Sequence, residues 1–357
     1  MAVSEPALRV LVLADSRSFH TERYVAELCR QGFETLVASL EHGTIDHHAL
    51  ARRGPFRTLH YSLAAAEVRR LVDEFRPHVV NPHFASGYGF LAARARRKNW
   101  PPILLNLWGS DILIVPRKTY LHRLKTRLAL EAAACVVGDS EYLLSEASRI
   151  GSIRQPQVIV WGPERRFFGL RREGAHSGPL RIIVPRPHEE VYNNLFILRA
   201  LAPLIESGAV VVTFPAFGGL VDRFRSAATS LIERGGLKLY EKQSRDDYMV
   251  LLAGHDVYLS AALSDSSPAS LLEAMGLGLI PVVGDIPGVR EWVNETSGFR
   301  FDLTRESDLR ETVLRVKDSR DDLASMRQGN QERVRREATF EDGVARTVVV
   351  MKCLAGL

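Results

Sequence analysis

The chain has 357 residues, of which 46% are hydrophobic and 25% charged, and its formal net charge is +5 at pH 7. This length suffices for two domains with a core each, and no apolar run approaches the roughly 20 residues that span a bilayer. Three scattered cysteines without metal-ligand spacing suit a reducing compartment. Because the first residues also lack a signal pattern, we expect a cytoplasmic protein.

Short β-branched and leucine-rich runs alternate with helical patterns along the chain. They predict strands at residues 9–14, 35–39, 79–81, 103–107, 135–137 and 158–160, with helices between them, for example at 21–31 and 64–75. Further on they predict strands at residues 180–184, 210–213, 237–240, 257–260, 279–283 and 298–301. Repeated strand–helix units indicate parallel sheets with helices on both faces.

The pattern pauses at residues 171–179, whose polar, glycine and proline composition predicts an interdomain linker. We therefore expect an α/β protein with doubly wound, Rossmann-like domains at residues 1–172 and 179–338. A final helix at 339–357 is expected to pack back on the first domain. Two such domains would face a cleft at the carboxyl ends of their strands, where these sheets bind ligands.

The most informative segment spans residues 264–292 and begins SDSSPASLLEAMGLG. Ser267 is a good N-cap and Pro268 suits the first helical position, so a helix is expected to begin there. Its small first turn leaves backbone N–H groups uncovered, and these groups, with the helix dipole, attract a diphosphate. The expected binding residues are Ser266, Ser267, Ala269, Ser270 and Leu271.

Two carboxylates accompany this helix start. Glu273 lies four residues after Ala269 on the same helix face, where it can accept hydrogen bonds from ribose hydroxyls. Asp265, ahead of the helix, is expected to hold hydroxyls of a sugar. The segment therefore fits a nucleoside diphosphate sugar. The alternative is a capped surface helix with solvated acids.

This segment resembles the donor-site motif of the retaining glycosyltransferases of family four, which have the GT-B fold. Glu273 lies in a Leu-Glu-Ala-Met sequence like theirs, and Asp265 stands eight positions earlier, where the family has another glutamate. The aspartate is one methylene shorter but keeps the charge. Trp161-Gly162-Pro163-Glu164, followed by two phenylalanines, is similar to the family's interlobe signature.

The first half carries two further points of resemblance. Trp108-Gly109-Ser110-Asp111 is similar to the family's His-Gly-Ser-Asp loop, and His20-Thr21-Glu22-Arg23 occupies the first strand–helix turn. The resemblance implies that the acceptor-side residues are His20, Thr21, Trp108, Gly109 and Ser110.

Arg186 follows the first strand of the second domain and matches the arginine that neutralises the donor diphosphate in this family. Its planar donor fork suits phosphate oxygens; a solvated loop position is the alternative. The family's nearby lysine is missing, and Tyr192 in its place donates a hydrogen bond without charge. Lys242 and Arg245 are candidates for the second cation, with a surface role equally open for either.

Trp108 stands where many relatives have a histidine near the reacting carbon. The resemblance implies that the leaving phosphate can itself receive the acceptor's proton, so that this histidine is dispensable. His83, at another strand end, is a further catalytic candidate, with a structural role as the alternative. Asp111 is expected to orient the acceptor hydroxyl or, by preference, to cap the next helix.

Basic residues gather between Arg94 and Arg127, with nine Lys/Arg against one acid. Lys118, His122 and Lys125 share one helical face, opposite a leucine face. This basic amphipathic helix is expected to contact an anionic membrane at its inner face, and the alternative is an ordinary solvated face. The sequence shows no nucleic-acid reader motif.

The sequence lacks the motifs of several other kinds of functional site. Asp-x-Asp, Cys-x-x-Cys and His-Glu-x-x-His are absent, so no metal is expected. The dinucleotide fingerprint and the Walker A sequence are absent too, so no cofactor beyond the sugar nucleotide is expected.

The sequence thus predicts a metal-independent, retaining hexosyltransferase that acts on a hydroxyl of a glycan or glycolipid, as in cell-surface polysaccharide synthesis. The alternatives are a non-hydrolysing nucleotide-sugar epimerase and a donor-binding subunit without turnover.

Overall fold

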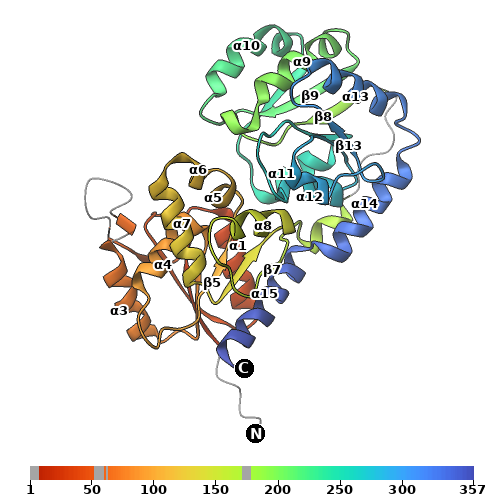
Figure 1. Cartoon of the computed structure of the whole chain (residues 1–357). Helices are drawn as coiled ribbons and strands as arrows, with labels where there is room; N and C mark the ends of the chain where they lie inside the picture. The colour runs from red at the N-terminus through yellow and green to blue at the C-terminus, as the bar shows by residue number, and fades with distance from the viewer. Residues whose placement is uncertain (1–7, 52–59, 62, 171–177) are drawn as a thin grey trace. The chain divides into compact units, whose positions relative to one another are not determined.

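The computed structural model describes residues 8–51, 60–61, 63–170 and 178–357. The chain divides into two compact units, which we call unit 1 (Met1–Val160 with Glu341–Leu357) and unit 2 (Trp161–Phe340) (Figure 1). Unit 1 ends at Val160, ahead of the domain boundary expected at residue 172. Residues 171–177 of the expected linker lie outside the described residues.

Unit 1 is built on parallel strands in the orders β3-β2-β1-β4 and β5-β6-β7. Isolated parallel bridges pair Val80 with Ile103 and His83 with Asn106, and they join β4 to β5. The strands are β1 (Arg9–Leu13), β2 (Glu34–Ser39), β3 (His48–Ala49), β4 (Val79–Pro82), β5 (Leu104–Asn106), β6 (Cys135–Gly138) and β7 (Gln157–Val158). All were expected except β3, whose two residues are too short to show a strand pattern.

The helices of unit 1 bury their apolar faces against this sheet. Side chains of β1, including Leu11 and Leu13, share one core with Val68, Leu91 and Leu143 from three of the helices. The helices are α1 (Phe19–Arg30), α3 (Ala65–Phe75), the π-helix η1 (Phe84–Gly89), α4 (Phe90–Ala95), α5 (Ser110–Leu113), α6 (Val115–Lys118), α7 (Tyr120–Ala132) and α8 (Glu141–Ser148).

The last helix, α15 (Phe340–Ala355), returns to unit 1. Its side chains Val344, Thr347 and Met351 are buried, and Arg346 Nη2 donates to the backbone oxygen of Val158 at 2.7 Å. The chain therefore crosses to unit 2 and ends on the unit in which it began (Figure 1).

Unit 2 has one parallel sheet in the order β10-β9-β8-β11-β12-β13. Its strands are β8 (Leu180–Ile183), β9 (Val210–Pro215), β10 (Leu237–Tyr240), β11 (Val257–Ser260), β12 (Ile280–Gly284) and β13 (Phe299–Phe301). The neighbouring helices are η2 (Arg165–Gly169), η3 (Glu190–Tyr192), α9 (Asn194–Glu206), α10 (Val221–Glu233), α11 (Arg245–Ala253), α12 (Ala269–Gly276), η4 (Pro287–Glu291), α13 (Glu306–Asp318) and α14 (Ala324–Glu337). The parallel sheets of the two units confirm the expected doubly wound α/β class.

The order of the strands reverses once in each unit. In unit 1, β1 lies between β2 and β4, and in unit 2, β8 lies between β9 and β11. At such a switch point the loops leave the carboxyl ends of the strands in opposite directions and open a ligand crevice. The segments after β8 and β11 carry Arg186 and Asp265, while those after β1 and β4 carry His20 and His83.

Among the described residues, none of the helices combines the length and apolar character that crossing a bilayer requires.

Candidate active site

The helix α12 begins one residue later than expected. Pro268 is its N-cap in an extended conformation, and Ser267 instead accepts a hydrogen bond from Trp292 Nε1 at 3.0 Å. The prediction that Ser267 is the cap is therefore wrong, because its hydroxyl is held by the indole. The backbone N–H groups of Ala269 and Ser270 have no hydrogen-bond partner among the described residues. These first-turn groups remain available to an anion, as the sequence predicts.

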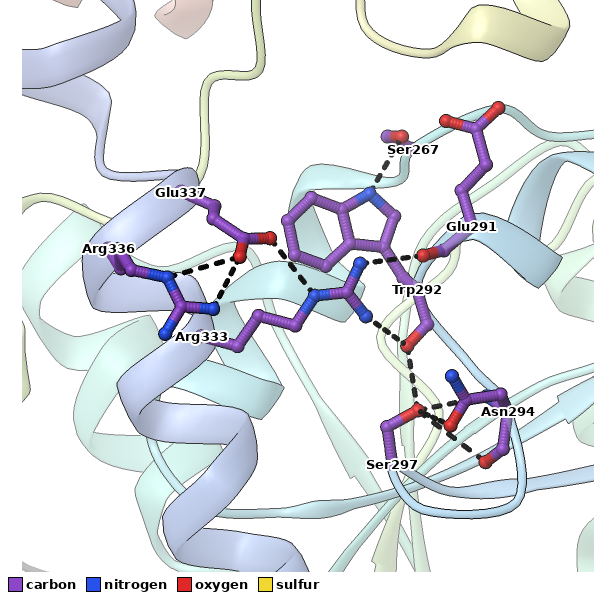
Figure 2. A network of polar contacts seen from close by, with 8 residues as sticks. All are labelled: Ser267, Glu291, Trp292, Asn294, Ser297, Arg333, Arg336 and Glu337. Carbon is purple, nitrogen blue, oxygen red and sulfur yellow. Dashed lines mark hydrogen bonds and ion pairs between the residues drawn. The ribbon is translucent and has the colours of Figure 1, made fainter.

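A polar network holds the loop in front of α12 (Figure 2). The Arg333 guanidinium of α14 lies 4.5 Å from the centroid of the buried Trp292 ring. Arg333 also donates to the backbone oxygens of Glu291 and Trp292, at 2.8 and 3.2 Å. Ser297 Oγ donates to the same Trp292 oxygen at 2.8 Å. Through Trp292, this network fixes Ser267 and the entry to the helix.

The loop that carries Asp265 packs closely on η4. A Cβ atom added at Gly288 would lie 2.1 Å from the backbone oxygen of Asp265, nearer than any real contact. Glycine is therefore required at this position for a steric reason, and the close approach holds the Asp265 backbone in place.

Arg186 and Asp265, predicted separately, form an ion pair with Nη2 and Oδ2 2.8 Å apart. Their side chains are only 17% and 16% exposed, so the alternative of a solvated loop arginine is wrong. Arg186 Nη1 also donates to Ser270 Oγ at 3.4 Å, and the guanidinium lies 4.2 Å from the centroid of the Tyr192 ring. Arg186 Nε is buried without a hydrogen-bond partner among the described residues. The predicted phosphate ligands on three segments are thus brought together.

Burial and the partner's charge act in opposite directions on each member of this pair. Burial acts to lower the pKa of Arg186, but the Asp265 carboxylate outweighs it, and the net pKa lies above its ordinary value. Burial raises the pKa of the Asp265 carboxyl, an effect that Arg186 opposes. Tyr258, whose hydroxyl lies 3.1 Å from Ser270 Oγ, stays neutral because burial raises its pKa to about 12. A buried guanidinium therefore lies beside the first turn of α12.

The loop of Arg186 is held by two residues that the sequence did not reveal. Asn194 Nδ2 donates to the backbone oxygens of Arg186 and Pro187, at 3.0 and 3.3 Å, and lies 3.1 Å from His188 Nδ1. His188 Nε2 lies 2.7 Å from the Pro215 oxygen. Because a carbonyl only accepts, Nε2 carries the proton and Nδ1 accepts from Asn194. Burial lowers the pKa of His188, so the ring holds this loop in its neutral form.

Glu273 is only 4% exposed, so the alternative of a solvated acid is wrong for it. Its Oε1 lies 2.7 Å from Arg245 Nη1. Arg245 also binds Glu164, with Nη2 and Oε2 2.6 Å apart, and its side chain is 13% exposed, which excludes the surface role for this arginine. Lys242, the other candidate cation, is exposed.

Two of the expected acceptor-side residues, His20 and Trp108, belong to an aromatic cluster in unit 1. The ring centroids of His20 and Trp108 are 5.2 Å apart, those of His83 and Trp108 5.7 Å, and those of Tyr24 and His83 5.0 Å. Thr21 is buried in α1. Gly109 precedes α5 with φ of 84°, a conformation that favours glycine, and Ser110 is exposed.

Two catalytic candidates of unit 1 are deeply buried. Asp111 lies inside α5, not ahead of it, so the expectation of an N-cap is wrong; Gly109 is the cap residue. Its Oδ2 accepts from the backbone N–H of Ala85 at 2.7 Å and its Oδ1 from that of Trp108 at 2.9 Å, while burial raises its pKa to about 6. His83 is neutral because burial lowers its pKa to about 3.

The helix α7 presents a different face from the one expected. Lys125 is buried, with Nζ 5.3 Å from the centroid of the Phe90 ring, and burial lowers its pKa. Tyr120, Leu121 and Leu128 are instead 81%, 51% and 39% exposed. The exposed cations near them are Arg117, Lys118, Arg123 and Arg127.

The two doubly wound units define a protein of the GT-B class, and a buried guanidinium lies beside the open helix start at the switch point of the second unit. Residues 9–140 match the family described as "Glycosyl transferase 4-like", and residues 198–333 match "Glycosyl transferases group 1". Together these segments cover most of the chain. The chain belongs to the group 1 glycosyltransferases, and the protein is a glycosyltransferase.

Solved structures show the same fold. HepE from Anabaena, in complex with UDP and glucose, has a TM-score of 0.80 at 15% identity, covering 97% of this chain and 99% of that one. Sucrose-phosphate synthase from Thermosynechococcus elongatus has a TM-score of 0.84 at 10% identity, with coverage of 98% and 99%. A putative UDP-N-acetylglucosamine 2-epimerase from Listeria monocytogenes has a TM-score of 0.69 at 13% identity, with coverage of 97% and 96%. No curated protein matches the sequence.

Proposed function

We propose that the protein is a retaining, metal-independent glycosyltransferase whose unit 2 binds a nucleoside diphosphate sugar. The single observation that carries this proposal is the buried Arg186, whose guanidinium lies beside the first turn of α12 at the switch point of the sheet. The similar structure of HepE, described in complex with UDP and glucose, supports a sugar nucleotide as the ligand.

In the proposed reaction, the first-turn N–H groups of α12 and Arg186 stabilise the negative charge that develops on the leaving diphosphate. Fixed donors of this kind, aimed at developing charge, are a main source of catalysis. They supply this stabilisation without a metal ion or another cofactor. For Arg186 to bind phosphate, its contact with Asp265 must loosen, which directs the Asp265 carboxylate toward hydroxyls of the sugar. Glu273 accepts hydrogen bonds from the ribose.

The acceptor is proposed to be a hydroxyl of a glycan or glycolipid that approaches the aromatic cluster of His20, Trp108 and His83. Neutral aromatic faces suit a sugar ring better than a charged ligand. Retention follows if the acceptor attacks the face that the diphosphate leaves and passes its proton to a phosphate oxygen. Asp111 holds the backbone of this region, since both of its oxygens accept from N–H groups.

We further propose that the exposed face of α7 contacts an anionic membrane surface. Apolar side chains of Tyr120 and Leu121, flanked by cations, suit the interface of such a bilayer. Replacing both residues with Asp should weaken cosedimentation with phosphatidylglycerol vesicles about tenfold or more. Unchanged binding to these vesicles would contradict the contact.

The decisive experiment for the proposed function is a thermal-shift screen against UDP-, GDP- and ADP-linked sugars, followed by product analysis with the sugar nucleotide that stabilises the protein. A transferase consumes the donor when an acceptor is present. An epimerase, whose fold is shared, converts the donor without an acceptor, and a donor-binding subunit binds it without any turnover. Glu273→Ala should abolish donor turnover with an unchanged circular dichroism spectrum; near-native activity would refute the assignment.

A further inference from the structure

A buried arginine in unit 2 joins two carboxylates that lie far apart in the sequence. Arg245 opens α11, Glu164 precedes η2, and Glu273 lies within α12. The side chains of Arg245, Glu164 and Glu273 are 13%, 12% and 5% exposed. Such burial withdraws all three charges from water, so each depends on the others for compensation.

The two carboxylates hold the arginine in different ways. Glu164 accepts from Arg245 Nε at 3.2 Å through each oxygen and from Nη2 at 2.6 Å. Phe167 adds a ring whose centroid is 5.3 Å from the guanidinium. Glu273 Oε1 lies 2.7 Å from the third nitrogen, Nη1. Glu164 and Phe167 thus hold the planar guanidinium so that its Nη1 group faces Glu273.

We propose that Arg245 is a positioning residue: Glu164 and Phe167 fix its guanidinium, and the guanidinium in turn orients the Glu273 carboxylate toward the ribose hydroxyls of the donor. The proposal rests on the proposed function, in which Glu273 binds the ribose. It replaces the sequence-based expectation that Arg245 is a second cation for the diphosphate, because all three of its nitrogens contact carboxylates.

A positioning role makes a prediction that a purely structural role does not. If Arg245 acts through Glu273, its loss should weaken only the recognition of the ribose hydroxyls. If it merely stabilises the fold, its loss should weaken every ligand of the site equally. The two cases are separated by comparing a nucleoside diphosphate with its 2′,3′-dideoxy analogue, which has the same diphosphate and base but lacks these hydroxyls.

The experiment is calorimetric titration of the full chain with UDP and 2′,3′-dideoxy-UDP, or with the guanosine or adenosine pair if the screen selects that base. The wild type should bind the ribose form about tenfold more tightly or better, as expected for hydrogen bonds to a charged acceptor. Arg245→Gln should reduce this preference to within about threefold, close to that of Glu273→Gln. Glu164→Gln, a milder change, should reduce it in the same direction and serves if the first variant does not fold.

Arg225→Gln is the matched control. Arg225 is another arginine of unit 2 that pairs with a glutamate, with its Nη2 3.6 Å from Glu241 Oε1, but both of these side chains are exposed. This variant should keep the wild-type preference. A wild-type preference in Arg245→Gln and Glu164→Gln would overturn the inference. A wild-type preference in Glu273→Gln, or none in the wild type, would instead overturn the ribose role in the proposed function.

Discussion

The two units place opposite chemistry at the same topological position. At the switch point of unit 2, the segments after β8 and β11 bring together the charges of Arg186 and Asp265. At the switch point of unit 1, the segments after β1 and β4 bring the aromatic rings of His20 and His83 against Trp108. A doubly wound sheet thus provides the crevice, while the residues that follow the strands select its ligand.

The charged site of unit 2 and the aromatic cluster of unit 1 also differ in the free energy that is needed to bury them. A buried ion pair loses hydration that its mutual attraction repays only in part, and Arg186 Nε is buried without a partner among the described residues. A bound phosphate would stabilise such a site. The cluster of unit 1 avoids this cost because His83 stays neutral. We therefore expect changes to the charged residues at the switch point of unit 2 to affect diphosphate binding, and changes to the aromatic cluster of unit 1 to leave it unaffected.

The largest effect is expected for Arg186→Gln. Loss of a preorganised charge at the leaving group should lower kcat/KM for the donor about 100- to 1000-fold and remove measurable binding of the nucleoside diphosphate in calorimetry. Arg225→Gln is the control, because Arg225 is an exposed arginine of unit 2 that pairs with Glu241. If Arg186→Gln bound the diphosphate like this control, the charged switch point would not be the donor site.

A smaller effect is expected for Gly288→Ala, which leaves the charges but displaces the Asp265 backbone. The overlap should destabilise unit 2 by about 1–3 kcal/mol, measured by urea denaturation, and should weaken diphosphate binding. Gly329→Ala is the control: its Cβ meets nothing within 4 Å, and alanine inside α14 should stabilise by about 0.5–1 kcal/mol. Equal stability of the two variants would contradict the close contact.

In unit 1, His83 should make stability depend on pH. Its pKa is about 3 in the folded chain and has its ordinary value of 6.5 in the unfolded chain. Between these two pH values the unfolded state therefore binds more protons than the folded state. This stabilising contribution is complete above pH 6.5 and is lost as the pH falls. Lowering the pH from 7 to 5 should cost the wild type about 2 kcal/mol more than His83→Gln in urea denaturation. Parallel losses in the two proteins would show that His83 protonates freely.

The smallest effect is expected for Trp108→Ala. Because the Trp108 indole carries no charge, its loss should leave nucleoside diphosphate affinity within about twofold of the wild type, a change below about 0.5 kcal/mol. Calorimetric titration measures it under the conditions used for Arg186→Gln. A large loss of diphosphate affinity in Trp108→Ala would contradict the claim that the diphosphate binds at the charged site of unit 2 and not at the aromatic cluster of unit 1.

The sequence pattern predicted the described strands except β3 and placed the start of α12 within one residue, because periodicity and helix-boundary residues are local signals. It also identified Arg186 and Asp265 one at a time, and the topology explains why they meet. It did not reveal that Glu164 would pair with Arg245, since that contact joins segments 81 residues apart.

Other contacts escaped prediction for related reasons. Trp292 and Arg333 come from a loop and a helix whose packing leaves no periodic signal. Lys125 was placed on the wrong face because α7 alternates basic and apolar residues so that either face can pack. The predicted N-cap role of Asp111 was wrong because α5 begins at Ser110, one residue before the aspartate, and Gly109 is its N-cap.

The most direct test of the donor site is a crystal structure of the protein with the nucleoside diphosphate that the screen selects. We expect a phosphate oxygen within hydrogen-bonding distance of the Ala269 and Ser270 N–H groups, with Arg186 turned from Asp265 toward the phosphate. A diphosphate bound elsewhere, with Arg186 still paired to Asp265 and the first turn of α12 unoccupied, would contradict the account.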